Sequence, residues 1–245
     1  MIRVCLAGIT GKVGRELFKA VRREKDIHLS SGVSRSQAGT VHDDVPVFVS
    51  VEEALRDVEV DVLVDYTSHS IVKENVLCAI ERGVHVVIGA SGLSEADYND
   101  LAQAAEARGT GIVAAGNFSI SAALLSRFAK EAAQFMKRWE ILDYGSPTKA
   151  DSPSGTAREL AYVLRDDVES PAPHNAQPAR GLELNGSQIH SLRLPGVYSG
   201  IEIQFGLPGE RLILRHESTS VEPYVAGTIH AIRRVVSING LARGV

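Results

Sequence analysis

The most constraining feature of the sequence is a glycine-rich turn close to its beginning. A short apolar run, residues 2–6, leads into Gly8, and further glycines stand at Gly11 and Gly14 before a segment with helical spacing. Glycines in a strand–turn–helix unit let the backbone approach a pyrophosphate, and the helix N-terminus offers N–H donors and a partial positive charge. The turn therefore predicts dinucleotide binding, with a purely structural turn as the alternative.

The first half of the chain alternates short apolar runs with segments of helical spacing. Continuous apolar strands that alternate with helices are typical of a parallel sheet covered on both faces. The apolar runs after the first are residues 27–33, 61–65, 84–88 and 111–114. We predict an N-terminal α/β domain of the Rossmann type, made of residues 1–118 and of residues 219–245, whose helix returns to it.

The second half has a different character. Residues 119–137 place apolar side chains such as Ile120, Leu124 and Phe128 at the spacing of one helical face, and a strand and a second helix follow. Three strand-like runs then lie close together with turns between them, so we expect them to pair antiparallel. They are residues 188–194, 200–205 and 211–216. Residues 119–218 are predicted to form an α+β domain with a mostly antiparallel sheet, for substrate binding and oligomerisation.

Two short segments are interpreted from composition. The proline-rich stretch 170–179 is expected to be an exposed loop. Cys5 and Cys78 lie in apolar segments, and two such cysteines are more easily explained as small buried residues in a reducing cytoplasm than as a disulfide framework.

Composition excludes several classes of protein. The net charge is −4 and the charges are interspersed, so there is no basic stripe for nucleic acid. No apolar run approaches the roughly 18–20 residues of a membrane helix, and the N-terminus enters the glycine turn too soon for a signal peptide. No His/Cys/Asp/Glu cluster has the spacing of metal ligands. We therefore expect a cytoplasmic protein with no metal, no nucleic-acid partner and no membrane partner.

The end of the second expected strand bears on the choice of cofactor. Sites selective for NAD place an acidic residue there to bind the ribose 2′-hydroxyl. This chain has Ser34 and Arg35 instead, and Lys12 adds a second positive charge nearby. We expect NADPH, with its 2′-phosphate near Arg35; NADH, with Arg35 as an ordinary solvated side chain, stays open.

Four segments carry longer motifs: residues 65–67 (Asp-Tyr-Thr), 89–92 (Gly-Ala-Ser-Gly), 115–119 (Ala-Gly-Asn-Phe-Ser) and 149–157 (Lys-Ala-Asp-Ser-Pro-Ser-Gly-Thr-Ala). Together they resemble the dihydrodipicolinate reductases of bacterial lysine biosynthesis. The first three are similar to that family's Asp-Phe-Thr, Gly-Thr-Thr-Gly and Ala-Pro-Asn-Phe-Ser, and the last is close to its signature Lys-x-Asp-Ala-Pro-Ser-Gly-Thr-Ala. The resemblance runs in order along essentially the whole chain.

This resemblance implies an NAD(P)H-dependent reductase of a small cyclic imino dicarboxylate, assembled as a homotetramer through the second sheet. A helix N-terminus binds anions in any case, so the turn before the helix suits one carboxylate, although a plain helix cap at Ser154 is the alternative. The substrate residues are then Ser154, Gly155 and Thr156, with Lys149 catalytic. The expected cofactor residues are Gly8, Thr10, Gly11, Lys12, Val13, Gly14, Ser34, Arg35, Tyr66, Thr67, Gly89, Ser91, Asn117 and Phe118.

The chain also departs from the family pattern. Two histidines that precede the family's lysine fall on Gly145 and Ser146, and a Ser-Ser-Arg segment near the end is Thr-Ser-Val here. Glycine cannot transfer a proton, and serine does so poorly at neutral pH. The alternatives that stay open are the same reaction with Lys149 or water as proton donor, a different cyclic imine or unsaturated acid, a regulatory protein that binds NADPH without turnover, and an oligomeric scaffold.

Overall fold

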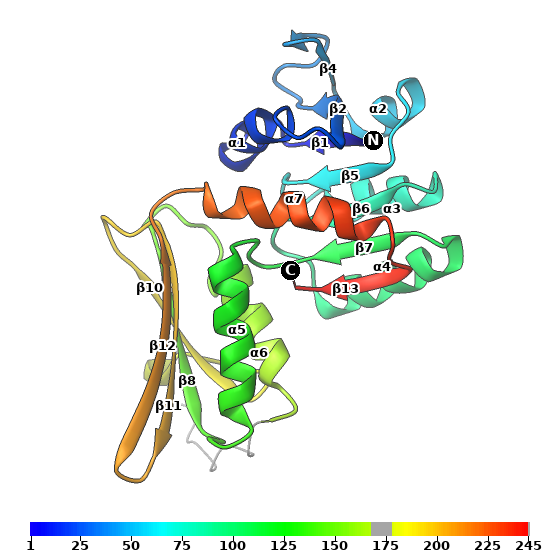
Figure 1. The fold of residues 1–245 in the computed structure, drawn as a ribbon. Coiled ribbons are helices and arrows are strands. Elements are labelled where there is room, and N and C mark those ends of the chain that lie inside the picture. The colour runs from blue at the N-terminus through cyan, green and yellow to red at the C-terminus, as the bar shows by residue number, and fades with distance from the viewer. Residues whose placement is uncertain (168–177, 245) are drawn as a thin grey trace. The chain divides into compact units, whose positions relative to one another are not determined.

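The computed structural model describes residues 1–167 and 178–244, which form two compact units (Figure 1). Unit 1 contains Met1–Phe118 and Val221–Val245, and unit 2 contains Ser119–Ser220. Most of the loop expected at 170–179 lies outside the described residues; its last two residues belong to a short 3₁₀ helix, Pro178–Arg180.

Unit 1 is built on an eight-stranded sheet with the strand order β13-β7-β6-β5-β1-β2-β4-β3. Every neighbouring pair is parallel except β3 with β4. The strands are β1 (Ile2–Ala7), β2 (Ile27–Val33), β3 (Val41–His42), β4 (Val45–Phe48), β5 (Val62–Asp65), β6 (His85–Ile88), β7 (Gly111–Ala114) and β13 (Gly240–Arg243). The predicted Rossmann-type sheet is confirmed. Its order reverses at β1, and such a switch point is where doubly wound sheets bind ligands.

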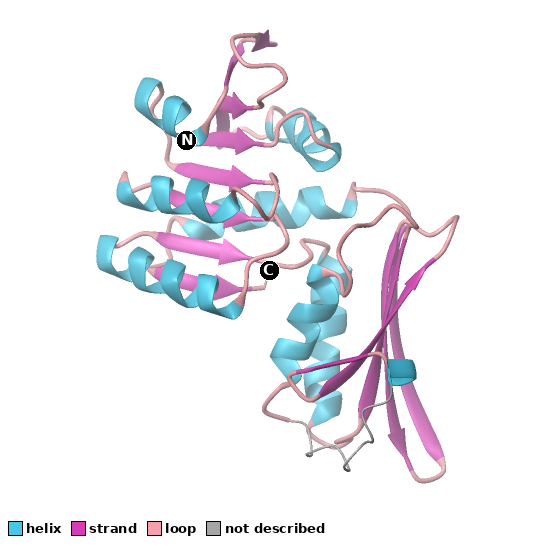
Figure 2. Cartoon of the chain, turned by 180° about the vertical axis from the view of Figure 1, so that it is seen from behind, coloured by secondary structure: helices cyan, strands magenta, loops and turns pink. Residues whose placement is uncertain are grey.

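Helices cover both faces of this sheet (Figure 2). One buried cluster packs α1 and α7 against the sheet, and a second packs α2, α3 and α4 against the other face. The helices are α1 (Lys12–Val21), α2 (Val51–Asp57), α3 (Val72–Glu81), α4 (Glu95–Arg108) and α7 (Pro223–Val235). Because both faces are buried, the central strands need apolar residues at every position, which is why they appear in the sequence as continuous apolar runs.

The C-terminal segment belongs to unit 1. Gly227 allows α7 to pack closely against the backbone of Phe118. Any side chain at this position would place its Cβ 1.8 Å from the carbonyl oxygen of Phe118. After α7 the chain adds β13 parallel to β7. This strand was not predicted, because its short sequence has no long apolar run.

Unit 2 has a five-stranded sheet with the order β12-β11-β8-β10-β9, against which two helices pack. Its elements are α5 (Ile120–Ala133), β8 (Trp139–Gly145), α6 (Gly155–Leu164), β9 (Leu182–Leu184), β10 (Ser187–Arg193), β11 (Ser199–Leu207) and β12 (Glu210–Ser218). Three of the four neighbouring pairs are antiparallel, which confirms the predicted α+β class.

One pairing prediction is wrong. β10 does not pair with β11; it lies on the other side of β8 and runs parallel to it, from Gln188 opposite Glu140 to Arg193 opposite Gly145. The reason is the long connection through α6, since a crossover with a helix joins parallel strands and a short turn joins antiparallel ones. β11 and β12 do form the expected hairpin.

The expected apolar face of α5 is only partly buried. Ile120, Leu124 and Phe128 are exposed to between 43% and 55%. The helix instead contacts the sheet through Leu125 and a row of alanines, whose small side chains allow a close approach.

Candidate functional site

The glycine turn after β1 is held tightly by backbone hydrogen bonds. The amide of Gly11 donates to the carbonyl of Gly8 at 2.9 Å, and the amide of Gly8 donates to the carbonyl of Val33 at 3.0 Å. Gly8 has a φ of +83°, and a Cβ on Gly14 would lie 2.1 Å from the oxygen of Gly8. Both positions require glycine, and they bring the start of α1 against the end of β2.

A cavity of about 490 Å³ opens beside this turn. Of the expected cofactor residues, its lining includes Gly8, Thr10, Gly11, Ser34, Arg35 and Thr67. The hydroxyls of Thr10 and Ser34 are 3.0 Å apart, so they join the two edges of the cavity. Its lining combines glycine backbone and serine and threonine hydroxyls with apolar side chains such as Val33 and Ile71 and with the charged Arg35 and Glu74. The backbone amides and hydroxyls suit a sugar and a pyrophosphate.

The other expected cofactor residues do not line this cavity: Lys12, Val13, Gly14, Tyr66, Gly89, Ser91, Asn117 and Phe118. The hydroxyl of Tyr66 is 2.7 Å from that of Thr228 on α7, and Phe118 is 2% exposed. A Cβ on Gly89 would lie 2.3 Å from the ring of Tyr66. The side chains of Tyr66 and Phe118 therefore pack within unit 1.

Asp65, to which the sequence motifs assigned no role, holds Thr67 in position through hydrogen bonds. Oδ1 of Asp65, at the end of β5, accepts hydrogen bonds from the amide of Thr67 at 2.8 Å and from its hydroxyl at 2.6 Å. Asn75 donates to Oδ2 at 2.7 Å. Burial raises the pKa of Asp65, and these hydrogen bonds act against that rise. A carboxylate at the end of a fully buried strand is the signal that would have identified it.

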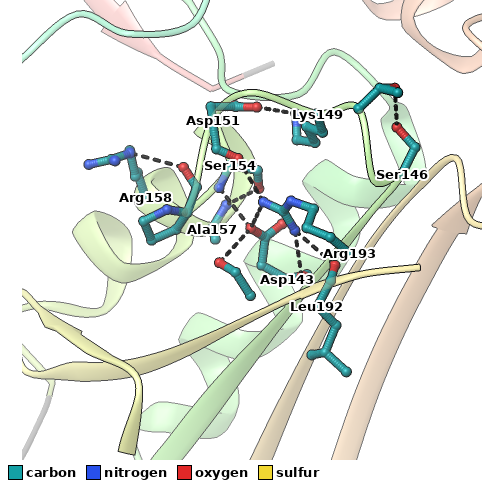
Figure 3. Close-up of polar contacts among 12 residues, drawn as sticks. Asp143, Ser146, Lys149, Asp151, Ser154, Ala157, Arg158, Leu192 and Arg193 are labelled. Carbon is teal, nitrogen blue, oxygen red and sulfur yellow. Dashed lines mark hydrogen bonds and ion pairs between the residues drawn. The ribbon is translucent and has the colours of Figure 1, made fainter. Parts of the chain in front are cut away.

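In unit 2, the expected catalytic residue Lys149 lies in the loop between β8 and α6 (Figure 3). Its Nζ is 2.8 Å from Oδ1 of Asp151. At Gly145, where the resembling family has a histidine, a Cβ would lie 2.8 Å from Cδ of Lys149 and 3.3 Å from Nη1 of Arg193. The atoms nearest to such a Cβ thus belong to the side chains of Lys149 and Arg193.

Ser154 caps α6. Its hydroxyl accepts a hydrogen bond from the amide of Ala157 at 3.2 Å, and its own amide donates to Oδ2 of Asp143 at 2.8 Å. The side chain of Ser154 therefore acts as the N-cap of α6, the alternative that the sequence left open. Gly155 and Thr156 occupy the first two helical positions, where the helix dipole is positive.

An ion pair lies beneath this loop, and neither of its residues was among those expected from the sequence. Nη2 of Arg193, on β10, is 2.9 Å from Oδ2 of Asp143, on β8, and the Asp143 side chain is only 1% exposed. On β8 the side chains that face the helices are Trp139, Ile141 and Asp143. A single carboxylate in an otherwise apolar row of a strand was the available signal.

The described residues contain no helix long and apolar enough to cross a membrane, and no group of three or more His, Cys, Asp or Glu side chains arranged to hold a metal ion.

A doubly wound sheet with this glycine turn, followed by a separate α+β unit, defines a two-unit protein with a dinucleotide-binding fold. Comparison with known families gives the particular group. The family description "Dihydrodipicolinate reductase, N-terminus" matches residues 2–118, and "Dihydrodipicolinate reductase, C-terminus" matches residues 121–243. The chain belongs to the dihydrodipicolinate reductase family, as the sequence motifs predicted.

Relatives of similar length support this assignment. A 4-hydroxy-tetrahydrodipicolinate reductase of Moorella thermoacetica is 36% identical over 99% of this chain and 96% of its own length. One of Shouchella clausii is 34% identical over 100% of this chain and 98% of its own length. These relatives confirm that the chain is an oxidoreductase of this type.

Solved structures agree with the fold. A dipicolinate-bound dihydrodipicolinate reductase from Paenisporosarcina sp. TG-14 has a TM-score of 0.79 and 30% identity, and covers 100% of this chain and 98% of its own. An amine dehydrogenase from Mycobacterium smegmatis, with a TM-score of 0.67, 14% identity, and coverage of 98% of this chain and 94% of its own, shares the fold alone.

Proposed function

We propose that this protein reduces a small cyclic imino dicarboxylate with NADPH. The observation that carries the proposal is the segment 149–157, which retains the family signature and forms one connected polar cluster at the end of β8. Named relatives are 4-hydroxy-tetrahydrodipicolinate reductases, and a related structure holds dipicolinate, a planar ring with two carboxylates. The substrate proposed here shares its six-membered nitrogen ring and its two carboxylates.

The start of α6 would bind one substrate carboxylate. Ser154, Gly155 and Thr156 surround the positive end of the helix, and the ammonium of Lys149 lies on the loop that leads to it. A carboxylate gains about 0.3–1 kcal/mol from a helix N-terminus and more where the site is partly buried. An ammonium beside it adds a charge-assisted hydrogen bond.

The reaction needs a hydride and a proton. A bound reduced nicotinamide would supply the hydride to the ring of the substrate, and one proton must be added to complete the two-electron reduction. Gly145 has no proton to give, and the neutral hydroxyl of Ser146 is a weak acid, which leaves Lys149 as the proton donor of this cluster. The ion pair with Asp151 keeps the ammonium on this loop, 2.8 Å from the carboxylate.

The cofactor would lie along the glycine turn, with its pyrophosphate at Gly8, Gly11 and the start of α1. Arg35 follows Ser34 in the lining of the cavity, and Lys12 is exposed at the first position of α1. Neither cation forms an ion pair within the described residues. Two unpaired cations in place of an acidic residue favour the 2′-phosphate of NADPH over the free hydroxyl of NADH.

A homo-oligomer, a tetramer by resemblance, is proposed through the sheet of unit 2. α5 and α6 pack on one face, whereas the opposite face of β11 and β12 carries exposed Ile213 and the pair Glu202–Arg215. Light scattering on the purified protein would measure the assembly. Two cysteines without a disulfide are consistent with the proposed cytoplasmic location.

The test is NADPH oxidation by purified protein with a freshly generated substrate, made from pyruvate and aspartate semialdehyde by the enzyme that condenses them. We expect rapid loss of the reduced-nicotinamide absorbance. Lys149→Ala should lower kcat by about 10²- to 10⁴-fold, the usual contribution of a positioned proton donor. Tight NADPH binding without oxidation would instead assign a different imine substrate or a binding-only role.

The cofactor preference has its own test. Arg35→Ala should raise the KM for NADPH about tenfold or more, which corresponds to the loss of one charge-assisted contact, and leave the KM for NADH unchanged. Arg56→Ala is a matched control because Arg56 is an exposed arginine of unit 1 that pairs with its neighbour Asp57. Equal effects on both cofactors would contradict the 2′-phosphate assignment.

A further inference from the structure

We propose that Arg193 and Asp143 are positioning residues that hold the Lys149 loop and the start of α6 in the geometry required to bind a dicarboxylate. The proposal rests on the proposed function, because it takes these segments as the substrate site. Neither residue is among the expected site residues, and both come from strands beneath the loop (Figure 3).

Arg193 uses its guanidinium to tie three segments together. Nη1 donates to the carbonyl oxygens of Asp143 at 3.0 Å and Leu192 at 2.9 Å. Nη2 donates to Oδ2 of Asp143 at 2.9 Å and to the carbonyl oxygen of Asp151 at 2.7 Å. The Nε atom is buried. With four N–H contacts already made and the fifth group enclosed, this guanidinium is a support for the loop and has no donor left for a substrate.

Asp143 completes the support from the other side. Its Oδ2 accepts three hydrogen bonds, from Arg193, from the amide of Ser154 at 2.8 Å and from the hydroxyl of Ser191 at 3.2 Å. The ion pair therefore fixes both ends of the turn between Lys149 and α6: the carbonyl of Asp151 and the amide of Ser154. The orientation of the Lys149–Asp151 pair and of the first helical amides depends on those two points.

The cluster is also incompletely satisfied. Among the described residues, five buried side-chain polar atoms have no hydrogen-bond partner, and three of them lie here: Oδ1 of Asp143, Oδ2 of Asp151 and Nε of Arg193. A pair kept only for stability is expected to satisfy its buried atoms or to be replaced by apolar residues. Retained unsatisfied charges beside Lys149 favour a role in organising the site.

The test uses dipicolinate as the probe and the full chain with NADPH bound. Arg193→Lys keeps the charge, but a single ammonium cannot reach the four acceptors of the guanidinium. We expect the Kd for dipicolinate, measured by calorimetry, to rise at least tenfold. The Kd for NADPH should stay within twofold, because its proposed site lies in unit 1. In turnover, the substrate KM should rise and kcat should fall together.

Two further variants separate positioning from general damage. Ser191→Ala removes only the longest contact to Asp143, at 3.2 Å, and should raise the dipicolinate Kd a few-fold. This variant tests the proposal even if Arg193→Lys does not fold. Arg165→Lys is the matched control, since Arg165 is an exposed arginine of unit 2 that pairs with its neighbour Asp166 at the far end of α6. It should leave dipicolinate binding unchanged.

The possible results distinguish the positioning role from the proposed reaction. Dipicolinate binding that is sensitive to Arg193→Lys, without turnover of the imine, would support the positioning role and overturn the proposed reaction. Normal turnover with no effect of Arg193→Lys or Ser191→Ala, or an equal effect of Arg165→Lys, would overturn the positioning role alone. A wild-type protein that does not bind dipicolinate would overturn both.

Discussion

The two units build their candidate sites from different materials. Beside the glycine turn of unit 1, the cavity is shaped by glycine backbone, by hydroxyls such as those of Thr10 and Ser34, and by aliphatic side chains such as Val33. At the end of β8 in unit 2, the shape depends on charges, above all on the buried pair Asp143–Arg193.

Because of this difference, different substitutions should damage the two sites. A site made of backbone tolerates changes of side chain but no added Cβ at Gly8 or Gly14, because the added atom meets backbone oxygen. A site made of buried charges tolerates no loss of one partner, because the other charge is left in a medium of low dielectric constant. The following predictions test this contrast, from the largest expected effect to the smallest.

The largest effect is expected for Asp143→Ala. Removing one partner of a buried ion pair costs about 3–5 kcal/mol, because Arg193 would keep its charge without a counterion. Urea unfolding followed by a probe in unit 2 measures this loss. Glu217→Ala, which removes an exposed partner of Arg215, should cost less than about 1 kcal/mol. Similar losses in the two variants would contradict the contrast.

Gly14→Ala comes next. A Cβ at this position would lie 2.1 Å from the oxygen of Gly8, so the turn must shift. Overpacking of this kind costs about 1–3 kcal/mol, and we expect NADPH affinity to fall about 10- to 100-fold. Gly206→Ala is the control, since nothing lies within 4 Å of a Cβ there. Fluorescence titration measures the NADPH affinity of both variants. Unaltered affinity in Gly14→Ala would contradict the explanation that close backbone packing shapes the cofactor site.

A moderate effect is expected for Tyr66→Phe. It removes the 2.7 Å hydrogen bond to Thr228 and leaves the ring in place. The loss should be about 0.5–1.5 kcal/mol, the net value of one buried hydrogen bond. Thermal unfolding measures it, and the double variant with Thr228→Val should show that the two losses are not additive. Additive losses would mean that the hydrogen bond makes no net contribution.

The smallest effect concerns a surface pair that joins α7 to the chain before β2. The hydrogen bond from Arg233 lowers the pKa of Asp26 from 3.8 to about 2. A pKa that is lower in the folded state adds stability above the unfolded value, and that stability disappears as the pH falls from about 4 to about 2. Arg233→Gln should therefore be slightly less stable than wild type at pH 7 and equal to it near pH 2. A pH-independent difference in urea midpoints would contradict this assignment.

Much of unit 1 was predictable from sequence because its signals are local. The apolar run of β1, the required glycines at Gly8 and Gly14 and the alternation of strands and helices each reflect a constraint on neighbouring residues. Even there, the role of Asp65 was missed, since its partner Asn75 comes from a helix ten residues later.

Unit 2 was predicted less well because its partners are distant. The position of β10 beside β8 follows from a crossover whose direction no local pattern states, and the burial of α5 through alanines depends on what it packs against. Arg193 appears in the sequence as one of many charged residues. Only the parallel pairing of β8 and β10 places it over Asp143, 50 positions away along the chain.

The dinucleotide-binding turn, the succession of strands and helices, the family, and the candidate residues Lys149 and Ser154–Thr156 could all be predicted from the sequence. The side chains that support them could be identified only in the folded chain: the Asp143–Arg193 pair, and Lys149 and Arg193 as the nearest neighbours of Gly145. The cause is the distance along the chain over which each interaction acts. Turn geometry and hydrophobic periodicity act between neighbours, whereas the energy of a buried charge depends on residues that only the folded chain brings together.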